Sequence, residues 1–278
     1  MTWTDMTALT GLVAWYKPET LAASYANGDP ISTWADSSGN GRDLTGTTTT
    51  RPLALASAIN GYMAADFDGT DDVLSSASYT HSGNIVVAMV FNLDAIKNYN
   101  AIASIHNSAT PAYPPYYYCC FSYASGDFAT VLDDGTVRYW TGDYTYGGTP
   151  TASSTNYIAV SSFSAIGSLL KTNGEHNRWK KASNGNPASP TGTAYIHLGA
   201  TGISGGFLNG KLAEVIIWTP TSDHAEVPWV EGYLADKYAI TLADGHLFKN
   251  AAPENAPTTY NATGGATLAS DARIERLK

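Results

Sequence analysis

The chain has 278 residues, which is long enough for one large β domain with a sizeable core. Hydrophobic residues make up 44% of it and charged residues only 14%, a balance that favours many short strands and polar turns over helices. The formal net charge of −9, with no cluster of lysine and arginine, excludes nucleic acid as an expected partner, and no apolar run approaches the roughly 20 residues needed for membrane insertion.

Short β-rich stretches recur along the chain and are separated by turn residues. The most continuous apolar run, 84–91, is typical of a strand that is buried on both faces. Asp-Gly at 134–135 and Asn-Gly at 173–174 and 184–185 predict tight hairpins. The predicted strands are 12–16, 63–67, 84–91, 101–105, 117–123, 128–132, 137–140, 157–163, 194–198 and 212–218. Their even spacing predicts an all-β sandwich or jelly roll with two antiparallel sheets.

One short helix is predicted near residues 225–238. Apolar residues recur there on one face at helical spacing, at Val227, Val230, Leu234 and Tyr238. Asp223 together with Glu226 predicts a capping box, and Pro228 fits only in the first turn of the helix.

The character of the chain changes after residue 240. Alanine, proline and asparagine dominate a linker-like stretch at 251–257, and a short segment of mixed charge follows at 267–278. Such a segment has little to bury on its own. We therefore expect one sandwich domain over 1–240 and a C-terminal linker and assembly tail over 241–278.

Two neighbouring cysteines and the first residues bear on the compartment. Side chains of adjacent residues in a strand point to opposite faces, so we expect one buried thiol and one outward thiol at Cys119 and Cys120; a vicinal disulfide is the strained alternative. The N-terminal residues lack the basic start and apolar stretch of a signal peptide. We therefore expect synthesis in a host cytoplasm without use of the general secretion route.

Several motifs occur in the order found in one superfamily. An aliphatic-Trp strand at 12–16 precedes a Trp-Ala-Asp-Ser-Ser-Gly-Asn-Gly turn at 34–41 and a Phe-Asp-Gly-Thr-Asp-Asp stretch at 67–72. A strand at 210–218 and a helix at 230–238 close the domain. In these features the chain resembles the concanavalin A-like lectin/glucanase superfamily, and more narrowly the laminin-G-like modules of bacterial surface proteins and bacteriophage structural proteins. The resemblance implies a jelly-roll sandwich and leaves the function open.

Catalytic patterns are missing from the sequence. The enzymes of this superfamily use a Glu-x-Asp-x-x-Glu strand that aims two carboxylates at the glycosidic bond, and the glutamates here never take that spacing. There is no Gly-x-Ser-x-Gly elbow, and histidine and cysteine form no zinc motif. We expect no enzymatic activity, and glycoside hydrolysis is kept only as a remote alternative.

Calcium is the one cofactor that the residues leave open, because laminin-G-like modules sometimes hold an ion with loop carboxylates. Asp66, Asp68, Asp71 and Asp72 offer hard oxygen ligands within a short span. A solvated turn without an ion is the favoured interpretation of these residues.

Aromatic residues in two stretches suggest a contact surface. Flat rings stack on sugars, while Asp and Asn bind hydroxyl groups; tyrosine is equally common in contacts between subunits, which we favour slightly. The candidate residues for glycan or subunit contact are Tyr113, Tyr116, Tyr117, Tyr118, Trp140, Asp143, Tyr144 and Tyr146.

These observations favour a non-enzymatic structural protein of a bacteriophage virion, such as a capsid decoration, head-fibre or tail-associated protein. Its partners would be other virion proteins, further copies of itself and glycans of the host surface. The alternative is a carbohydrate-binding module of a bacterial surface protein, although such modules usually carry a signal sequence and neighbouring domains.

Overall fold

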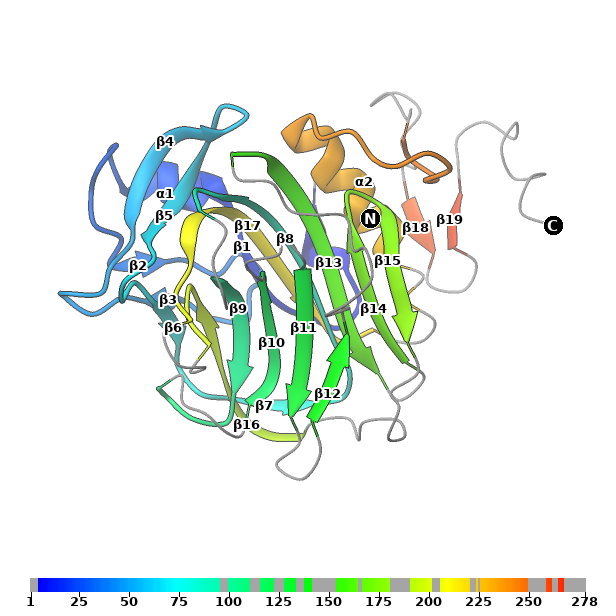
Figure 1. Cartoon of the computed structure of the whole chain (residues 1–278), viewed down its shortest axis with the longest axis horizontal. Coiled ribbons are helices and arrows are strands. Elements are labelled where there is room, and N and C mark those ends of the chain that lie inside the picture. Colours follow the sequence, from blue (N-terminus) through cyan, green and yellow to red (C-terminus); the bar gives the residue numbers. More distant parts are fainter. Residues whose placement is uncertain are drawn as a thin grey trace.

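The computed structural model describes residues 5–95, 100–110, 116–122, 128–133, 138–141, 154–164, 167–180, 191–201, 206–220, 224, 226–249, 259–261 and 265–267. These residues form a sandwich of two antiparallel sheets, as the sequence predicts, and a separate two-stranded hairpin of β18 (Thr259–Asn261) and β19 (Gly265–Thr267) (Figure 1).

The back sheet has eight strands. Across the sheet they are β15 (Glu175–Lys180), β14 (Gly167–Thr172), β13 (Asn156–Ser164), β8 (Ile85–Leu93), β17 (Asn209–Trp218), β5 (Tyr62–Asp68) and β4 (Leu53–Ile59), and β1 (Leu12–Tyr16) also pairs with β17.

The front sheet has nine strands. Across the sheet they are β12 (Arg138–Thr141), β11 (Phe128–Asp133), β10 (Tyr116–Ser122), β9 (Asn100–His106), β16 (Thr191–Leu198), β6 (Leu74–Ser76), β3 (Leu44–Thr45) and β2 (Thr33–Trp34), and β7 (Tyr79–Ser82) also pairs with β16.

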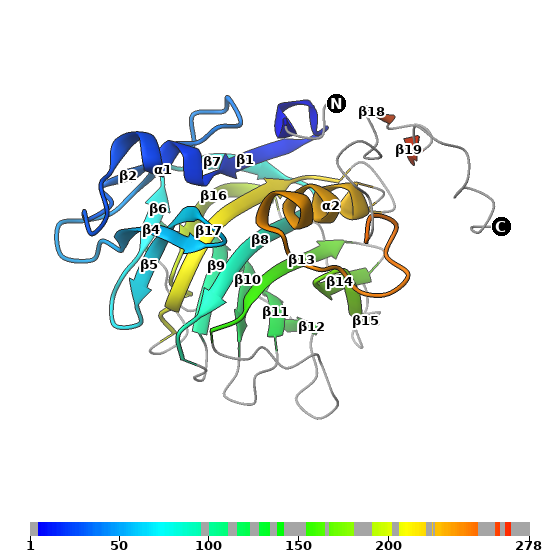
Figure 2. The ribbon, with the colours of Figure 1, turned by 90° about the horizontal axis from the view of Figure 1, so that it is seen from above.

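A helix covers the outer face of the back sheet. Helix α2 (Val227–Tyr238) lies across β17, β8 and β13 in the view from above (Figure 2). Pro228 lies in its first turn, as predicted, but the predicted capping box is wrong. Glu226 is itself the N-cap residue and its side chain makes no capping hydrogen bond, and Asp223 lies outside the described residues.

Strand β8 explains how the sandwich acquires two cores. All nine of its residues are buried, which confirms the prediction from its continuous apolar sequence. The odd-numbered residues from 87 to 91 pack between the two sheets, and the even-numbered ones from 86 to 90 pack on the outer face beneath α2. Because side chains alternate along a strand, a strand with a core on each side needs apolar residues at every position.

The two predicted turns that the structure describes have the expected geometry. Asn173 and Gly174 join β14 to β15 with φ of 49° and 80°, as a type I′ hairpin turn requires. In the turn at 34–41, the Asp36 carboxylate accepts hydrogen bonds from the backbone N–H of Ser38 at 2.8 Å and of Trp15 at 3.0 Å. That turn therefore fastens β1 to the neighbouring loop without involving a ligand.

Several short elements were not predicted. Helix α1 (Pro18–Ser24) has seven residues and the 3₁₀ helix η1 (Met6–Ala8) has three, too few for a periodic pattern. Strands β2 and β3 have two residues each and owe their existence to pairing with their neighbours. Each of the ten predicted strands is present, with ends that differ by at most three residues.

The packed domain extends past residue 240. Leu242 and Phe248 are buried in the outer core, and the backbone N–H of Ala243 donates to the carbonyl of Asn173 at 2.8 Å. Residues 241–249 therefore belong to the sandwich by their contacts. The role predicted for the remaining tail, assembly, stays a prediction.

Two further findings concern the cysteine pair and the helices. Cys120 is buried with a free thiol, which confirms the buried member of the cysteine pair, and burial raises the pKa of that thiol; the Cys119 side chain lies outside the described part. Within the described residues, every helix is too short or too polar to cross a membrane.

Candidate functional site

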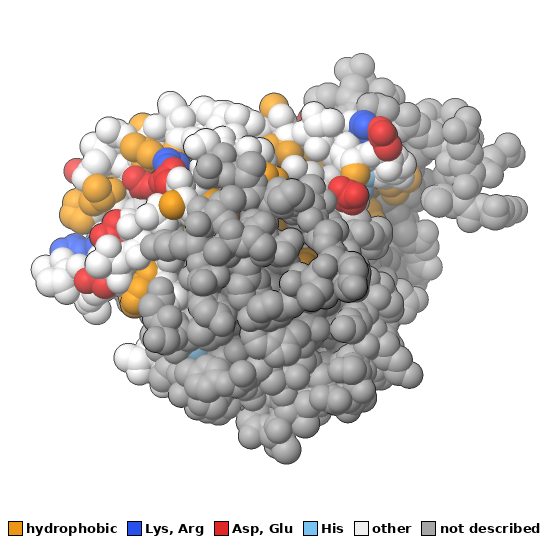
Figure 3. Space-filling model, viewed as in Figure 1, with side chains coloured by type: hydrophobic (Ala, Val, Ile, Leu, Met, Phe, Trp, Pro, Cys, Tyr) orange, Lys and Arg blue, Asp and Glu red, His pale blue; other side chains and the backbone are white. Residues whose placement is uncertain are grey.

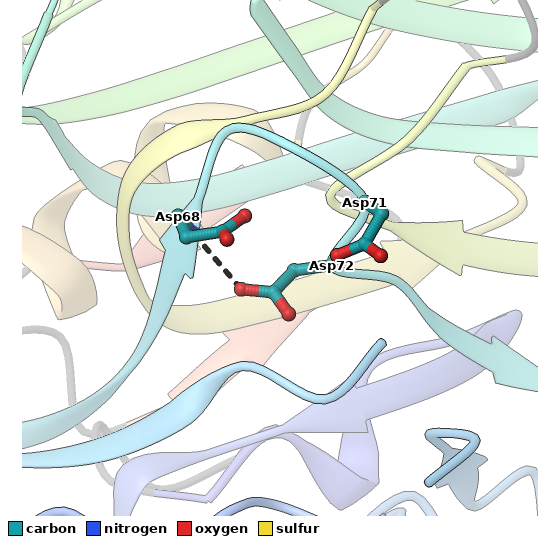
Figure 4. A group of neighbouring side chains, drawn as sticks. All are labelled: Asp68, Asp71 and Asp72. Atoms are coloured by element: carbon teal, nitrogen blue, oxygen red, sulfur yellow. Dashed lines mark hydrogen bonds between the residues drawn. The ribbon is translucent and has the colours of Figure 1, made fainter. Parts of the chain in front are cut away.

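The acidic turn between β5 and β6 is the group of predicted ligand residues that the structure brings together. Asp68 ends β5, and its carboxylate accepts a hydrogen bond from the backbone N–H of Thr70 at 2.7 Å. The Asp72 carboxylate accepts from the backbone N–H of Asp68 at 2.9 Å. These two bonds close the turn, and they bring Asp71 beside the other two carboxylates (Figure 4).

The geometry of this turn can be compared with a calcium site. Ligand oxygens of Asp68, Asp71 and Asp72 all lie within 4.8 Å of one another. Calcium–oxygen distances are roughly 2.3–2.6 Å, so oxygens on opposite sides of one ion are about 5 Å apart and the three carboxylates fit one coordination shell. They would supply only three of the roughly six to eight oxygens that calcium takes, so backbone carbonyls and water would have to complete the shell.

The electrostatics of the turn also bear on a cation. Asp72 is buried while Asp68 and Asp71 are exposed. Burial raises the pKa of Asp72, and the nearby carboxylates of Asp68, Asp71 and Asp66 raise it further. A bound cation would offset this repulsion, but hydrogen bonds within the turn already stabilise it, so the solvated turn remains the favoured interpretation.

Asp66 does not belong to the acidic turn. It lies earlier in β5, 3.8 Å from the ammonium of Lys211, which also pairs with Asp94. Burial raises the pKa of Asp66, and the Lys211 charge opposes that shift. The prediction of Asp66 as a fourth ligand is therefore wrong, because the strand turns its carboxylate toward β17 and a lysine.

Basic and acidic side chains are interspersed on the described surface. On the described part of the face in Figure 3, basic side chains lie beside acidic ones and do not form a patch of their own. Among the described residues, Lys211 pairs with Asp94 and Lys249 pairs with Asp244.

The predicted aromatic surface is described only in part. Tyr113, Asp143, Tyr144 and Tyr146 lie outside the described residues. The backbones of Tyr116 and Tyr117 begin β10, and Trp140 belongs to β12, so these residues lie in strands of the front sheet and not in loops. Their role in glycan or subunit contact stays a prediction.

Tyr118 is a core residue, so its assignment to a contact surface is wrong. Its ring is buried between the two sheets, and its hydroxyl shares a hydrogen bond with the hydroxyl of Ser161 on β13. Cys120, two residues later, is buried in the same core. Residues two apart in a strand share a face, so the side chains of Tyr118 and Cys120 both point into this core.

Two buried glutamates were not singled out from the sequence. Glu214 on β17 and Glu231 on α2 are both fully buried on the outer side of the back sheet. Glu231 pairs with Lys171 and accepts from His246 at 3.0 Å, and Glu214 is held by a lysine and three aromatic residues. A lone glutamate inside the apolar run 212–218 was the available signal, because a buried carboxylate needs internal partners.

Comparisons with known proteins give similarity in fold. No family model and no curated protein matches the sequence. The binding domain of Paraclostridial Mosquitocidal Protein 1 has a TM-score of 0.55 at 10% identity, with 81% of this chain and 52% of that chain covered. The ligand-binding domain of botulinum neurotoxin serotype D in complex with N-acetylneuraminic acid has a TM-score of 0.51 at 10% identity, with 80% and 50% covered.

A third structure is closer in size. Domain 4 of AbnA, an extracellular arabinanase from Geobacillus stearothermophilus, was solved in complex with arabinotriose. It has a TM-score of 0.52 at 14% identity, with 75% of this chain and 92% of that chain covered. The chain thus spans about half the length of the two toxin domains. The match to the arabinanase domain covers 75% of this chain. Together these similarities show a shared β-sandwich fold.

Proposed function

We propose that this chain is a non-enzymatic, concanavalin A-like binding module that contacts glycans and is displayed as a structural protein on a bacteriophage virion. The observation that carries the glycan part is its likeness to domain 4 of the arabinanase, over 92% of that domain. Arabinotriose is bound there by a sandwich of comparable extent. We infer that aromatic rings on this architecture give the chain a surface on which sugars stack.

The buried carboxylates support a non-enzymatic role. A retaining or inverting glycosidase needs two carboxyl groups that face the substrate across a cleft. Glu214 and Glu231 are instead fully buried between α2 and the back sheet, and each is paired with a lysine. In that position they neutralise cations within the fold.

The virion part of the proposal rests on the resemblance to laminin-G-like modules of phage structural proteins, on the low content of charged residues and on the tail after residue 249. We infer that the tail fastens copies of the sandwich to one another or to neighbouring virion proteins. The alternative is a carbohydrate-binding module of a bacterial surface protein, which the likeness to a domain of an extracellular enzyme favours.

A glycan array tests the sugar-binding part. We expect the full chain to bind a defined set of oligosaccharides, and Tyr117→Ala to lower that binding at least tenfold. Leu53→Ala is the matched control, because Leu53 is an exposed apolar residue on β4 of the other sheet and its loss should leave binding unchanged. A flat array for the unmodified chain would rule out direct sugar recognition.

Mass spectrometry of purified phage particles separates the two settings. The protein should be found in intact virions at a fixed stoichiometry with the other structural proteins. Its absence from particles, together with a positive array, would favour the bacterial surface module.

A further inference from the structure

The ammonium group of Lys237 lies among three tyrosine rings. Its Nζ is 5.3 Å from the ring centroid of Tyr62, 5.5 Å from that of Tyr238 and 5.6 Å from that of Tyr233. All three distances are within the roughly 6 Å over which an aromatic face attracts a cation. Tyr62 belongs to β5 and the other residues to α2, so two elements far apart in the sequence build this environment.

A buried carboxylate lies against the same ammonium. Glu214 Oε2 is 2.8 Å from Lys237 Nζ, and the Glu214 side chain is fully buried. The hydroxyls of Tyr233 and Tyr238 each donate to Glu214 at 2.8 Å, and the indole N–H of Trp15 donates at 2.7 Å. Hydrogen bonds from neutral donors therefore hold the carboxylate in place independently of the lysine.

The hydroxyls of Tyr233 and Tyr238 are held in the protonated form, as donors to Glu214. Burial is the first cause that raises the pKa of Tyr233 and of Tyr238 well above the ordinary value, and the charge of Glu214 is the second. Both hydroxyls thus stay protonated toward the carboxylate. The Tyr233 hydroxyl also accepts a hydrogen bond from Lys237 Nζ at 3.2 Å, so that ring meets the cation at its oxygen edge, whereas Tyr62 and Tyr238 present their ring faces.

The outer end of this environment reaches the surface. Glu19 on α1, whose side chain is half exposed, lies 2.9 Å from Lys237 Nζ. The Lys237 side chain itself is 10% exposed. An ammonium group at this position is therefore close to solvent at one end and contacts a buried anion at the other.

We propose that Tyr62, Tyr233, Tyr238 and Glu214 form a binding site for a primary alkylammonium group, which the protein fills with its own Lys237. We call these four residues the ammonium cage. Aromatic faces, a hydroxyl acceptor and a hydrogen-bonded carboxylate are groups that recognise alkylammonium ligands generally, and here Tyr62 and Tyr238 supply the faces and Tyr233 the hydroxyl. The inference is independent of sugar binding, because the cage lies on the outer side of the back sheet.

The cage explains why the end of α2 stays on the sheet. A buried carboxylate without a cation is strongly unfavourable, whereas a paired and fully hydrogen-bonded one is tolerated. Filling the cage joins β1, β5, β17, α1 and α2 at one point. Removing the lysine side chain should leave a cavity of defined shape with an unpaired negative charge at its base.

Chemical rescue tests the proposal. Lys237→Ala removes the atoms from Cγ to Nζ, which correspond to a propylammonium ion. We expect n-propylammonium chloride to raise the Tm of this variant in a saturable manner, by about 2–3 °C at ten times its Kd. The neutral 1-propanol and equal concentrations of sodium chloride should give no such rise.

Two further variants make the outcome specific. Lys237→Met fills the cavity with an uncharged chain of similar length, so neither it nor the unmodified protein should respond to propylammonium. Adding Glu214→Gln to Lys237→Ala should abolish the response, because the cage then lacks its anion. A Lys237→Ala protein that ignores propylammonium, or responds equally to 1-propanol, would overturn the proposal.

Should Lys237→Ala fail to fold alone, the same question can be asked during refolding. Recovery of folded protein with propylammonium and not with 1-propanol would support the cage. Equal recovery with both, or with neither, would contradict it.

Discussion

Tyr118 and Ser161 share a hydrogen bond in the core between the two sheets. Replacing Tyr118 by phenylalanine removes that bond and leaves the Ser161 hydroxyl buried, so we expect a loss of about 1–3 kcal/mol in the free energy of unfolding. Tyr118→Ala should cost roughly 3–5 kcal/mol, because it also opens a cavity. Urea unfolding measures both values. If the Tyr118→Ala variant were as stable as the unmodified protein, the Tyr118 ring could not be a core residue.

His197 makes the stability depend on pH. Burial lowers its pKa from 6.5 to about 4, against a smaller opposite effect of its hydrogen bond to the Ser108 carbonyl. Between these two values the unfolded chain binds a proton that the folded chain does not, so stability is lost as the pH falls from 6.5 toward 4.

His197→Gln should remove this contribution to the pH dependence of stability. A glutamine amide still donates to the Ser108 carbonyl, but it does not titrate. In unfolding measured from pH 7 to 4, the slope should decrease by as much as about 1.4 kcal/mol per pH unit. His81, whose pKa burial also lowers, keeps part of the acid sensitivity in the variant. Identical slopes would show that His197 is not held as a neutral imidazole.

Asp72 acts in the opposite direction. The pKa of Asp72 is raised above the ordinary 3.8, so the folded chain binds the proton more readily than the unfolded chain. Stability is therefore lost as the pH rises from 3.8 through the raised pKa of the folded chain. Asp72→Asn keeps an oxygen for the Asp68 N–H but does not titrate. As the pH rises from 3 to 6, the free energy of unfolding of the variant should therefore increase relative to that of the unmodified protein. A relative decrease would contradict the raised pKa of Asp72.

The residues that sequence patterns identified correctly are those with a local cause. Trp15, Trp34 and Trp218 are core residues, because large apolar rings at strand positions are stabilised by burial. Tyr118 could not be placed in the same way, since three consecutive tyrosines carry no alternation that distinguishes the two faces. Asp66 differs from Asp68 through its partner Lys211, which is 145 residues away in sequence and adjacent only in the fold.

The segment 241–249 packs against the outer core of the sandwich. Phe248 is buried against the outer core although it lies in the part expected to be a tail. Phe248→Ala should lower the free energy of unfolding by roughly 3–5 kcal/mol. Asp244→Ala is the control, because that side chain is exposed, and it should leave the unfolding midpoint unchanged.

Equal stability of Phe248→Ala and Asp244→Ala would mean that the packed domain ends near residue 240, as the sequence suggested. The predicted boundary follows the end of the predicted helix at 238, whereas the burial of 241–249 depends on contacts with the outer core and with the β14–β15 turn. Helix α1 was missed for a related reason, since seven residues show no period and its packing comes from β5 and β1.

For the whole molecule, the fold was far more predictable than the function. Strand spacing, hairpin turns and the two-sided apolar strand β8 each constrain the backbone locally, and together they determine a two-sheet sandwich. Which rings reach a ligand depends instead on loops and on pairs distant in sequence. The same sandwich serves toxins and an arabinanase, so the function must be established from the contact surface.

Native mass spectrometry of the full chain with an oligosaccharide selected on the glycan array tests non-enzymatic glycan binding. We expect a saturable complex whose mass is the sum of the protein and the intact oligosaccharide, unchanged after a day of incubation. The absence of any complex would contradict glycan binding, and the appearance of shortened oligosaccharides would contradict the non-enzymatic role.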